Sequence, residues 1–166
     1  MVYVLLLRGV NVGGKNKVSM SDLTEALSNE GFEDVSFYIN SGNLFFRSTQ
    51  SLEHCSSAIA HLLARDYAFP IPFVLMSKED YLAEKAELPD WWQGDLARRD
   101  VLFIPNNTDK ASILDFINTS ELYNEIVYIG QHSIFWGKYD EAEYLKSTYH
   151  KKLIKQDFYK RITIRN

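Results

Sequence analysis

Residues 8–17, with the sequence RGVNVGGKNK, combine residue types that could bind an anion. The stretch holds three of the chain's eight glycines, together with three cations and no acidic residue. Glycine lets the backbone turn its N–H groups toward a ligand, and Arg and Lys side chains add positive charge. The pattern therefore predicts a loop that binds a negatively charged group such as a phosphate.

The same stretch departs from the phosphate loop of NTPases at a defining position. Gly9, Gly14 and Lys15 fit the spacing GxxxxGK, but Asn16 stands where a Ser or Thr would bind Mg²⁺. The next helix is expected to begin near Ser19, whereas the phosphate loop leads into a helix at its lysine. We therefore predict that the protein is not an NTPase.

No spacing in the sequence assigns a reaction or a metal. His54 and His61 lie seven residues apart on one predicted helix, which is too far for ligands on successive turns, and Cys55 is the single cysteine. Catalytic sets such as Ser/His/Asp are assembled in space and cannot be read from spacing. We predict no metal site and no cofactor, assign no catalytic residue, and leave open whether the protein is an enzyme.

The apolar pattern gives the element order β-α-β-β-α-β twice. In the first half, the predicted strands are 2–7, 34–40, 44–47 and 71–76, with helices after Ser19 and from Leu52. In the second half, the predicted strands are 101–104, 125–129, 133–136 and 162–165, with helices around Ile113 and from Asp140 to Leu153. Segment 78–99 interrupts the pattern with a charged helical stretch and a connector.

This order predicts an α+β fold that is a tandem duplication of a ferredoxin-like βαββαβ unit with antiparallel sheets. Each half is expected to place two helices on one face of a four-stranded sheet. The predicted boundaries are 1–77 for the first half, 78–99 for the helical connector, and 100–166 for the second half.

The predicted fold brings the glycine loop beside the turn after the second strand. The first and third strands are antiparallel neighbours in this fold, so Arg8 emerges next to residues 40–43. The first helix begins at the same edge and directs its positive dipole end there. The predicted ligand-binding residues are Arg8, Asn11, Gly13, Gly14, Lys15, Lys17, Asn40, Ser41 and Asn43. The alternative is a loop that the glycines merely shape, with solvated cations.

Charge and strand composition make nucleic acid the less favoured partner. The net charge is −4, although residues 144–166 carry +6, which indicates internal pairing or an anion site near that end. Val2-Tyr3-Val4 is similar to the aromatic first strand of an RNA recognition motif, but residues 43–47 lack the matching third-strand signature. We therefore predict that Tyr3, Phe45 and Phe46 lie in the core or between the halves.

The sequence shows no sign of membrane insertion or secretion. The apolar run at residues 2–7 is shorter than the core of a signal peptide, and no run approaches the ~20 residues that span a bilayer. A single cysteine cannot form an intramolecular disulfide, which suits a reducing compartment. We expect a cytoplasmic protein that makes no membrane contact, and the oligomeric state is left open.

Three segments resemble the bacterial family known as domain of unknown function 1697. They are residues 6–18, residues 38–43, and the C-terminal Thr163-Ile164-Arg165-Asn166. The resemblance spans essentially the whole chain and implies a duplicated ferredoxin-like fold, but no established activity. Chains of that family run on past the last motif, whereas this sequence stops at Asn166, so Arg165 and Asn166 are left out of the predicted site.

Three functions remain from the sequence. The first and favoured one is a binding module for a phosphate-bearing small molecule or a nucleotide at the 8–17 loop, because no acid–base pair is recognisable. The second is an enzyme of unknown reaction that uses the same edge. The third is a scaffold protein whose glycine loop is purely structural.

Overall fold

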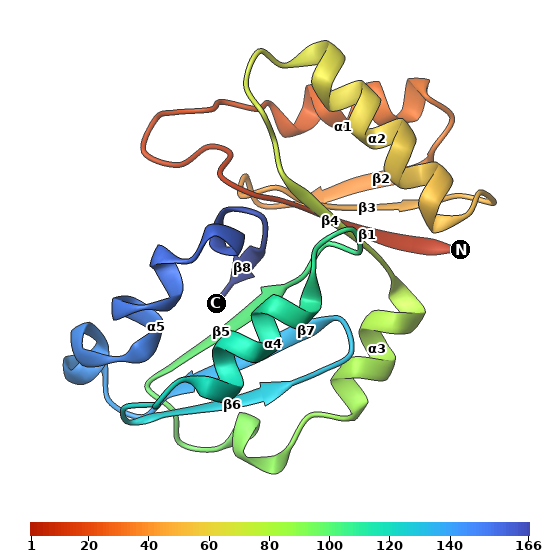
Figure 1. Ribbon diagram of the computed structural model, residues 1–166. Coiled ribbons are helices and arrows are strands. Elements are labelled where there is room, and N and C mark those ends of the chain that lie inside the picture. The colour runs from red at the N-terminus through yellow and green to blue at the C-terminus, as the bar shows by residue number, and fades with distance from the viewer. The chain divides into compact units, whose positions relative to one another are not determined.

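The computed structural model describes residues 1–166, which form two compact units, residues 1–83 and residues 84–166. Each unit contains a four-stranded antiparallel sheet with helices (Figure 1). The predicted α+β fold with a duplicated βαββαβ unit is confirmed. The finer boundaries at 77 and 100 stay a prediction.

The first unit follows the predicted element order. Its elements are β1 (Val2–Leu7), α1 (Met20–Asn29), β2 (Glu33–Tyr38), β3 (Asn43–Arg47), α2 (Leu52–Asp66), β4 (Phe73–Ser77) and the start of α3 (Lys78–Ala86). The strand order in the sheet is β2-β3-β1-β4. β1 and β3 are antiparallel neighbours as predicted, with Leu5 opposite Leu44.

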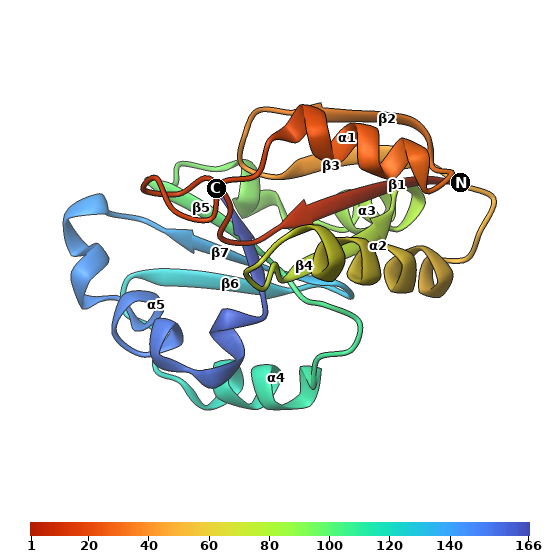
Figure 2. The same cartoon turned by 90° about the horizontal axis from the view of Figure 1, so that it is seen from above.

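The core of the first unit lies between the sheet and its two long helices. Leu5 and Leu44 point from the sheet toward Leu23 on α1 and Ile59 on α2, and all four side chains are fully buried. Figure 2 shows this unit from its helix side. The alternation of buried and exposed residues along β3 explains the arrangement, because successive side chains of a strand point to opposite faces.

Of the three aromatic residues predicted to lie in the core or between the halves, Tyr3 and Phe46 lie in this core and Phe45 does not. Tyr3 and Phe46 are fully buried and stack with their ring centroids 5.4 Å apart. Phe45, one residue earlier on β3, belongs to the opposite face of the sheet and is 38% exposed.

The second unit repeats the strand order of the first. Its regular elements are β5 (Arg98–Phe103), α4 (Lys110–Thr119), β6 (Glu125–Ile129), β7 (Ser133–Lys138), α5 (Thr148–Lys151) and β8 (Thr163–Arg165). Short 3-10 helices occupy Asp90–Gln93, Glu141–Lys146, Leu153–Lys155 and Asp157–Lys160. The sheet order is β6-β7-β5-β8, in which β5 takes the place that β1 has in the first sheet. None of the chain's helices has the length and apolar character needed to cross a membrane.

The predicted helix from Asp140 to Leu153 is wrong. The segment is instead broken at Ser147, whose backbone is extended (φ −66°, ψ 150°). The Ser147 hydroxyl accepts a hydrogen bond from the His150 N–H (3.1 Å) and so begins the new helix α5. Leu145, an apolar residue inside the predicted helix, is 65% exposed. A local cap thus ended a pattern that looked continuous.

The segment after α3 packs on the second sheet. The edge of the Trp92 ring meets Phe135 of β7 with a centroid distance of 5.2 Å. Arg99 of β5 fixes the backbone of this segment, because its Nε donates to the Trp92 carbonyl (2.7 Å) and its Nη2 donates to the Gly94 carbonyl. The face of this sheet opposite α4 is therefore covered by the chain's own connector residues.

Candidate functional site

The glycine loop has a left-handed backbone at five of its ten positions. Gly9, Gly13 and Gly14 have φ values of 68°, 58° and 73°, and Asn11 and Asn16 have φ values of 57° and 51°. Residues with a side chain resist this region, and Asn tolerates it better than most. All three glycines of the loop therefore adopt a backbone conformation that most other residues would resist.

The tip of the loop is a hairpin with a two-residue turn. The Lys15 N–H donates to the Val12 carbonyl (3.0 Å), and the Asn11 N–H donates to the Asn16 carbonyl (3.0 Å). Gly13 and Gly14, both with positive φ, supply the central pair that a type I′ turn requires. The loop is consequently a hydrogen-bonded structure with a defined path.

Asn11 joins the loop to the turn that follows β2. Its side-chain Nδ2 donates to the carbonyls of Val18 (2.9 Å) and Asn40 (2.7 Å), and its Oδ1 accepts from the Val18 N–H (2.8 Å). The predicted adjacency of the loop and the turn is therefore present. Because both amide hydrogens of Asn11 are used by the backbone, this side chain shapes the edge instead of reaching outward.

In the 40–43 turn, the backbone of Gly42 lies directly against Leu7 at the end of β1. Gly42 has φ +88°, and a Cβ at this position would lie 2.7 Å from the Leu7 Cβ. The Gly42 carbonyl accepts the Leu7 N–H (2.8 Å), so the turn rests directly on the end of β1. Asn43 secures the other side, donating through Nδ2 to the Tyr38 carbonyl (3.2 Å) and the Ser41 hydroxyl (2.9 Å).

The cations of the loop differ in their surroundings. Lys15 and Lys17 are exposed and form no ion pair with an acidic side chain. Arg8 is half-buried, and its N–H donates to the Pro72 carbonyl (2.8 Å). Helix α1 begins a few residues later, where the Ser19 hydroxyl accepts the Asp22 N–H (3.2 Å). All three cations of the loop thus lie in the segment between the end of β1 and the start of α1.

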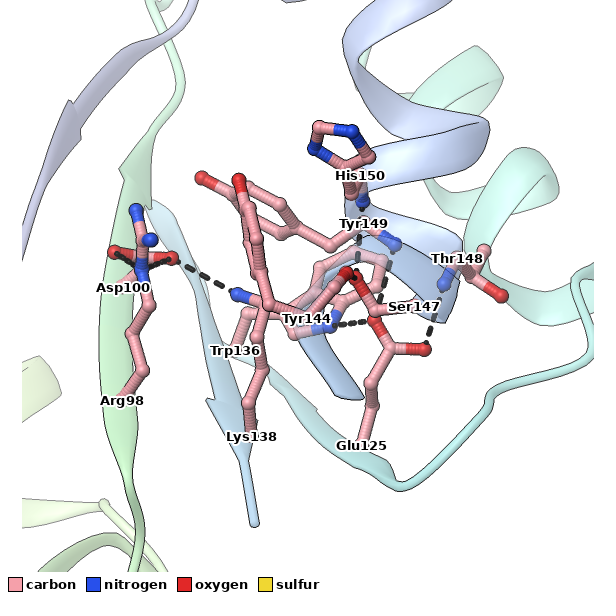
Figure 3. A network of polar contacts seen from close by, with 10 residues as sticks. All are labelled: Arg98, Asp100, Glu125, Trp136, Lys138, Tyr144, Ser147, Thr148, Tyr149 and His150. Carbon is pink, nitrogen blue, oxygen red and sulfur yellow. Dashed lines mark hydrogen bonds and ion pairs between the residues drawn. The ribbon is translucent and has the colours of Figure 1, made fainter. Parts of the chain in front are cut away.

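A second polar cluster, which the sequence analysis did not predict, lies in the second unit. Figure 3 shows Asp100 of β5 between two cations. Its Oδ2 lies 3.0 Å from the Lys138 Nζ and 3.1 Å from the Arg98 Nε. Asp100 and Lys138 are almost completely buried. The ammonium group of Lys138 also lies 3.6 Å from the centre of the Tyr149 ring.

Burial dominates the electrostatics of this cluster. Removal from water lowers the pKa of Lys138, and the Asp100 carboxylate opposes that shift. Burial, with a further contribution from Asp100, raises the pKa of the Tyr149 hydroxyl well above its usual range. Tyr149 is therefore a neutral ring that receives the Lys138 cation on its face.

A half-buried carboxylate, that of Glu125, lies on the other side of the same network. Glu125 Oε1 accepts from the Trp136 Nε1 and the Tyr149 N–H, both at 3.0 Å. Its Oε2 accepts from the N–H groups of Thr148 and Tyr123, both at 2.9 Å. Figure 3 shows this carboxylate pointing at the start of α5. With four donors satisfied, Glu125 anchors the helix and is not available as a base.

One sequence signal could have revealed this cluster. Asp100 lies two residues before Leu102, and Lys138 lies two residues after Trp136, so each charge occupies a core-facing position of its strand. A charge in phase with buried residues of a strand needs a partner inside the protein. Because Asp100 and Glu125 are both satisfied from within, the cluster supports the fold. No group of three or more His, Cys, Asp or Glu side chains is placed to hold a metal.

Comparison with known proteins identifies a family and a solved structure that this chain resembles. None of the curated proteins matches it. A solved structure, described as the conserved bacterial protein SP0830 from Streptococcus pneumoniae, shares 47% sequence identity and superposes with a TM-score of 0.94. The match covers 99% of this chain and 92% of that chain. The profile of the family described as "Protein of unknown function (DUF1697)" matches residues 1–135. The chain therefore belongs to the DUF1697 family.

Proposed function

We propose that the protein binds a phosphate-bearing small molecule at the edge formed by the 8–17 loop and the 40–43 turn. The observation that carries the proposal is a hydrogen-bonded loop with five left-handed residues that holds two exposed, unpaired lysines. A loop whose shape is already fixed loses little conformational entropy when a ligand binds. Successive N–H groups in left-handed and turn conformations form concavities that suit anions.

The residues of the edge have different roles in this proposal. Lys15 and Lys17 supply positive charge to the phosphate oxygens, and Arg8 adds a third cation where β1 ends. Gly13 and Gly14 allow the turn that presents these groups. Asn11 is a positioning residue, because its hydrogen bonds to Val18 and Asn40 hold the loop against the turn.

A thermal-shift screen against phosphorylated metabolites and nucleotides tests the proposal. A compound that binds the native protein alone, present at 100 times its Kd, stabilises it by about 2.7 kcal/mol. The double variant Lys15→Ala/Lys17→Ala is expected to weaken binding of the identified compound about tenfold or more, since each 1.4 kcal/mol is a factor of ten.

Lys78→Ala is the matched control, because Lys78 is also exposed in the first unit but lies at the start of α3. The control is expected to keep the wild-type affinity. If no phosphorylated compound shifts the melting temperature, or if the double variant and the control behave alike, the loop is structural and the proposal fails.

We also propose a cytoplasmic location. The single cysteine, Cys55, is a free thiol buried in the core of the first unit. A free thiol suits a reducing compartment. Localisation of a fluorescent fusion protein in bacterial cells tests this.

A further inference from the structure

Two exposed aromatic side chains lie on the sheet beside the loop. Tyr38 of β2 is 66% exposed, and Phe45 of β3 is 38% exposed. The register pairs Tyr38 with Asn43 and Ser36 with Phe45, so both rings belong to the face opposite α1 and α2. They are diagonal neighbours across two antiparallel strands, a spacing of about 7–8 Å that aromatic side chains can bridge.

The backbone joins this aromatic pair to the loop. Tyr38 lies two residues before Asn40, whose carbonyl accepts the hydrogen bond from Asn11 of the loop. The Tyr38 carbonyl itself accepts from the Asn43 side chain. The exposed rings and the exposed lysines are therefore attached to one hydrogen-bonded framework.

We infer that the ligand of the loop site is a nucleotide, whose base stacks on Tyr38 and Phe45 while its phosphate contacts the loop. This inference rests on the proposed function. Every nucleobase has a flat face that stacks on aromatic side chains, and each stacked base strengthens binding about 5- to 150-fold. A surface that combines two rings with the exposed Lys15 and Lys17 is complementary to a molecule that combines a base with a phosphate.

A peptide strand is the competing occupant, because β2 is an edge strand of the sheet. The structure argues against it. The pairing of β2 with β3 shifts register between Glu33 and Ser36, and Asp34 has φ +49°. Such irregularities twist an edge and interrupt the row of backbone groups that an added strand needs. The positive charge of the loop further favours an anionic partner.

A free nucleotide fits this surface better than a long nucleic acid does. The aromatic pair of Tyr38 and Phe45 offers only two rings, and the protein carries a net charge of −4. Single-stranded nucleic acid requires a cationic groove along several nucleotides. The expected ligand is therefore a nucleoside monophosphate or a closely related compound.

Isothermal titration calorimetry with a ladder of probes tests the inference. The probes are the four common nucleoside monophosphates, their parent nucleosides, ribose 5-phosphate and inorganic phosphate. At least one nucleotide is expected to bind ten times more tightly than ribose 5-phosphate. Tyr38→Ala is expected to remove that advantage, whereas Tyr38→Phe keeps it, because a phenyl ring stacks equally well.

Tyr81→Ala is the matched control. Tyr81 is a tyrosine of the same unit that is 44% exposed, but it lies on α3. This variant is expected to bind the nucleotide as the wild type does. Circular dichroism of the three tyrosine variants checks that each retains the fold.

The outcomes separate this inference from the proposed function. If ribose 5-phosphate binds as tightly as every nucleotide, the aromatic pair has no role and the inference falls, while the phosphate site stands. If no probe binds, both fall. If a nucleoside binds as tightly as its nucleotide and Lys15→Ala changes nothing, the phosphate does not contact the loop; the proposed function and the inference then both fall, and a surface that stacks bases alone remains. If Tyr38→Ala instead dissociates a dimer in sedimentation experiments, the surface is an interface between copies of the chain and the inference is overturned.

Discussion

A single amide, that of Asn11, determines the geometry of the candidate site. Its left-handed backbone (φ 57°) and its three side-chain hydrogen bonds act together. Asn is one of few residues with a side chain that adopts this backbone readily. Asn11 therefore both adopts the left-handed backbone that the loop needs and supplies the hydrogen bonds that hold the loop in place.

Substitution can separate these two contributions. Asn11→Gly keeps access to positive φ and removes the three hydrogen bonds, whereas Asn11→Ala loses both. We expect Asn11→Ala to destabilise the protein by about 1–3 kcal/mol more than Asn11→Gly does, the usual cost of a strained backbone conformation. Urea unfolding of both variants measures the difference. Equal stabilities would mean that the backbone conformation of Asn11 carries no strain for other residues.

The buried pair of Asp100 and Lys138 gives a second residue-scale prediction. Lys138→Met leaves Asp100 with Arg98 as its one cation, and Asp100→Leu leaves two cations without a counter-charge. Breaking a buried pair costs about 3–5 kcal/mol, because the remaining charge stays desolvated. We expect Asp100→Leu to be the more destabilising single change and the double variant to recover part of the loss. Urea unfolding of the three variants checks this order, and strictly additive effects would contradict it.

At the scale of elements, the features that could be predicted from the sequence were those set by residues close together along the chain. Strands and helices of the first unit follow apolar periodicity, and Ser19 and Gly31 mark the two ends of α1 as short-range signals do. The break at Ser147 was missed because the local cap there is supported by a residue that is distant in the sequence. Glu125 receives the N–H groups of Thr148 and Tyr149 from more than 20 residues away.

The candidate site shows the same division. The adjacency of the loop and the 40–43 turn followed from the antiparallel pairing of β1 and β3, so it could be predicted. The use of Asn11 and Asn43 as backbone anchors could not, because an Asn that binds a carbonyl and an Asn that faces solvent look alike in a sequence. The charges of Asp100 and Lys138 were visible, but their burial depends on which strands become neighbours.

The cap of α4 gives a prediction on the pH dependence of an element. Asp109 accepts from the Ser112 hydroxyl (2.6 Å) and the Ala111 N–H (3.0 Å), and these hydrogen bonds lower its pKa below the usual 3.8. Because the pKa is lower in the folded state, the stabilisation is present above about pH 4 and is lost as the pH falls through the folded value. NMR titration should show Asp109 ionising below 3.8. Ser112→Ala should move its pKa back toward 3.8, and an unchanged titration would exclude the hydroxyl as the main cause.

At the scale of the whole molecule, each unit has a hydrophobic core of its own. Leu23 on α1 and Ile113 on α4 are completely buried in these two separate cores. Truncating such a residue to alanine costs about 2–5 kcal/mol. We expect Leu23→Ala to speed hydrogen exchange in β1, β3 and β4 while β5 and β7 keep their protection, and Ile113→Ala to do the reverse. Exchange measured by mass spectrometry decides, and a loss of protection in both sheets from either variant would show that the units unfold as one.

The repeated topology does not repeat the chemistry. The loop after β1 has three glycines and three cations, whereas the equivalent loop after β5, residues 104–109, has neither and ends in the acidic cap Asp109. The first unit, which contains the candidate anion site, therefore differs from the second unit in the loop that follows the first strand of each sheet. The second unit carries instead the closed network of Asp100 and Glu125, which stabilises a sheet and its short helices.

The left-handed backbone of the glycine loop also affects how readily a protease can cleave the chain at this loop. Lys15 and Lys17 are exposed on a loop tip, the kind of place where a chain is usually nicked. Trypsin, however, must bind several residues around a lysine in an extended conformation, and here the flanking Gly14 and Asn16 have positive φ within a closed hairpin. Cleavage would require the hairpin to open first, so its rate would report the stability of the loop. A compound that occupies the edge would then slow this cut even if it changed nothing else in the chain.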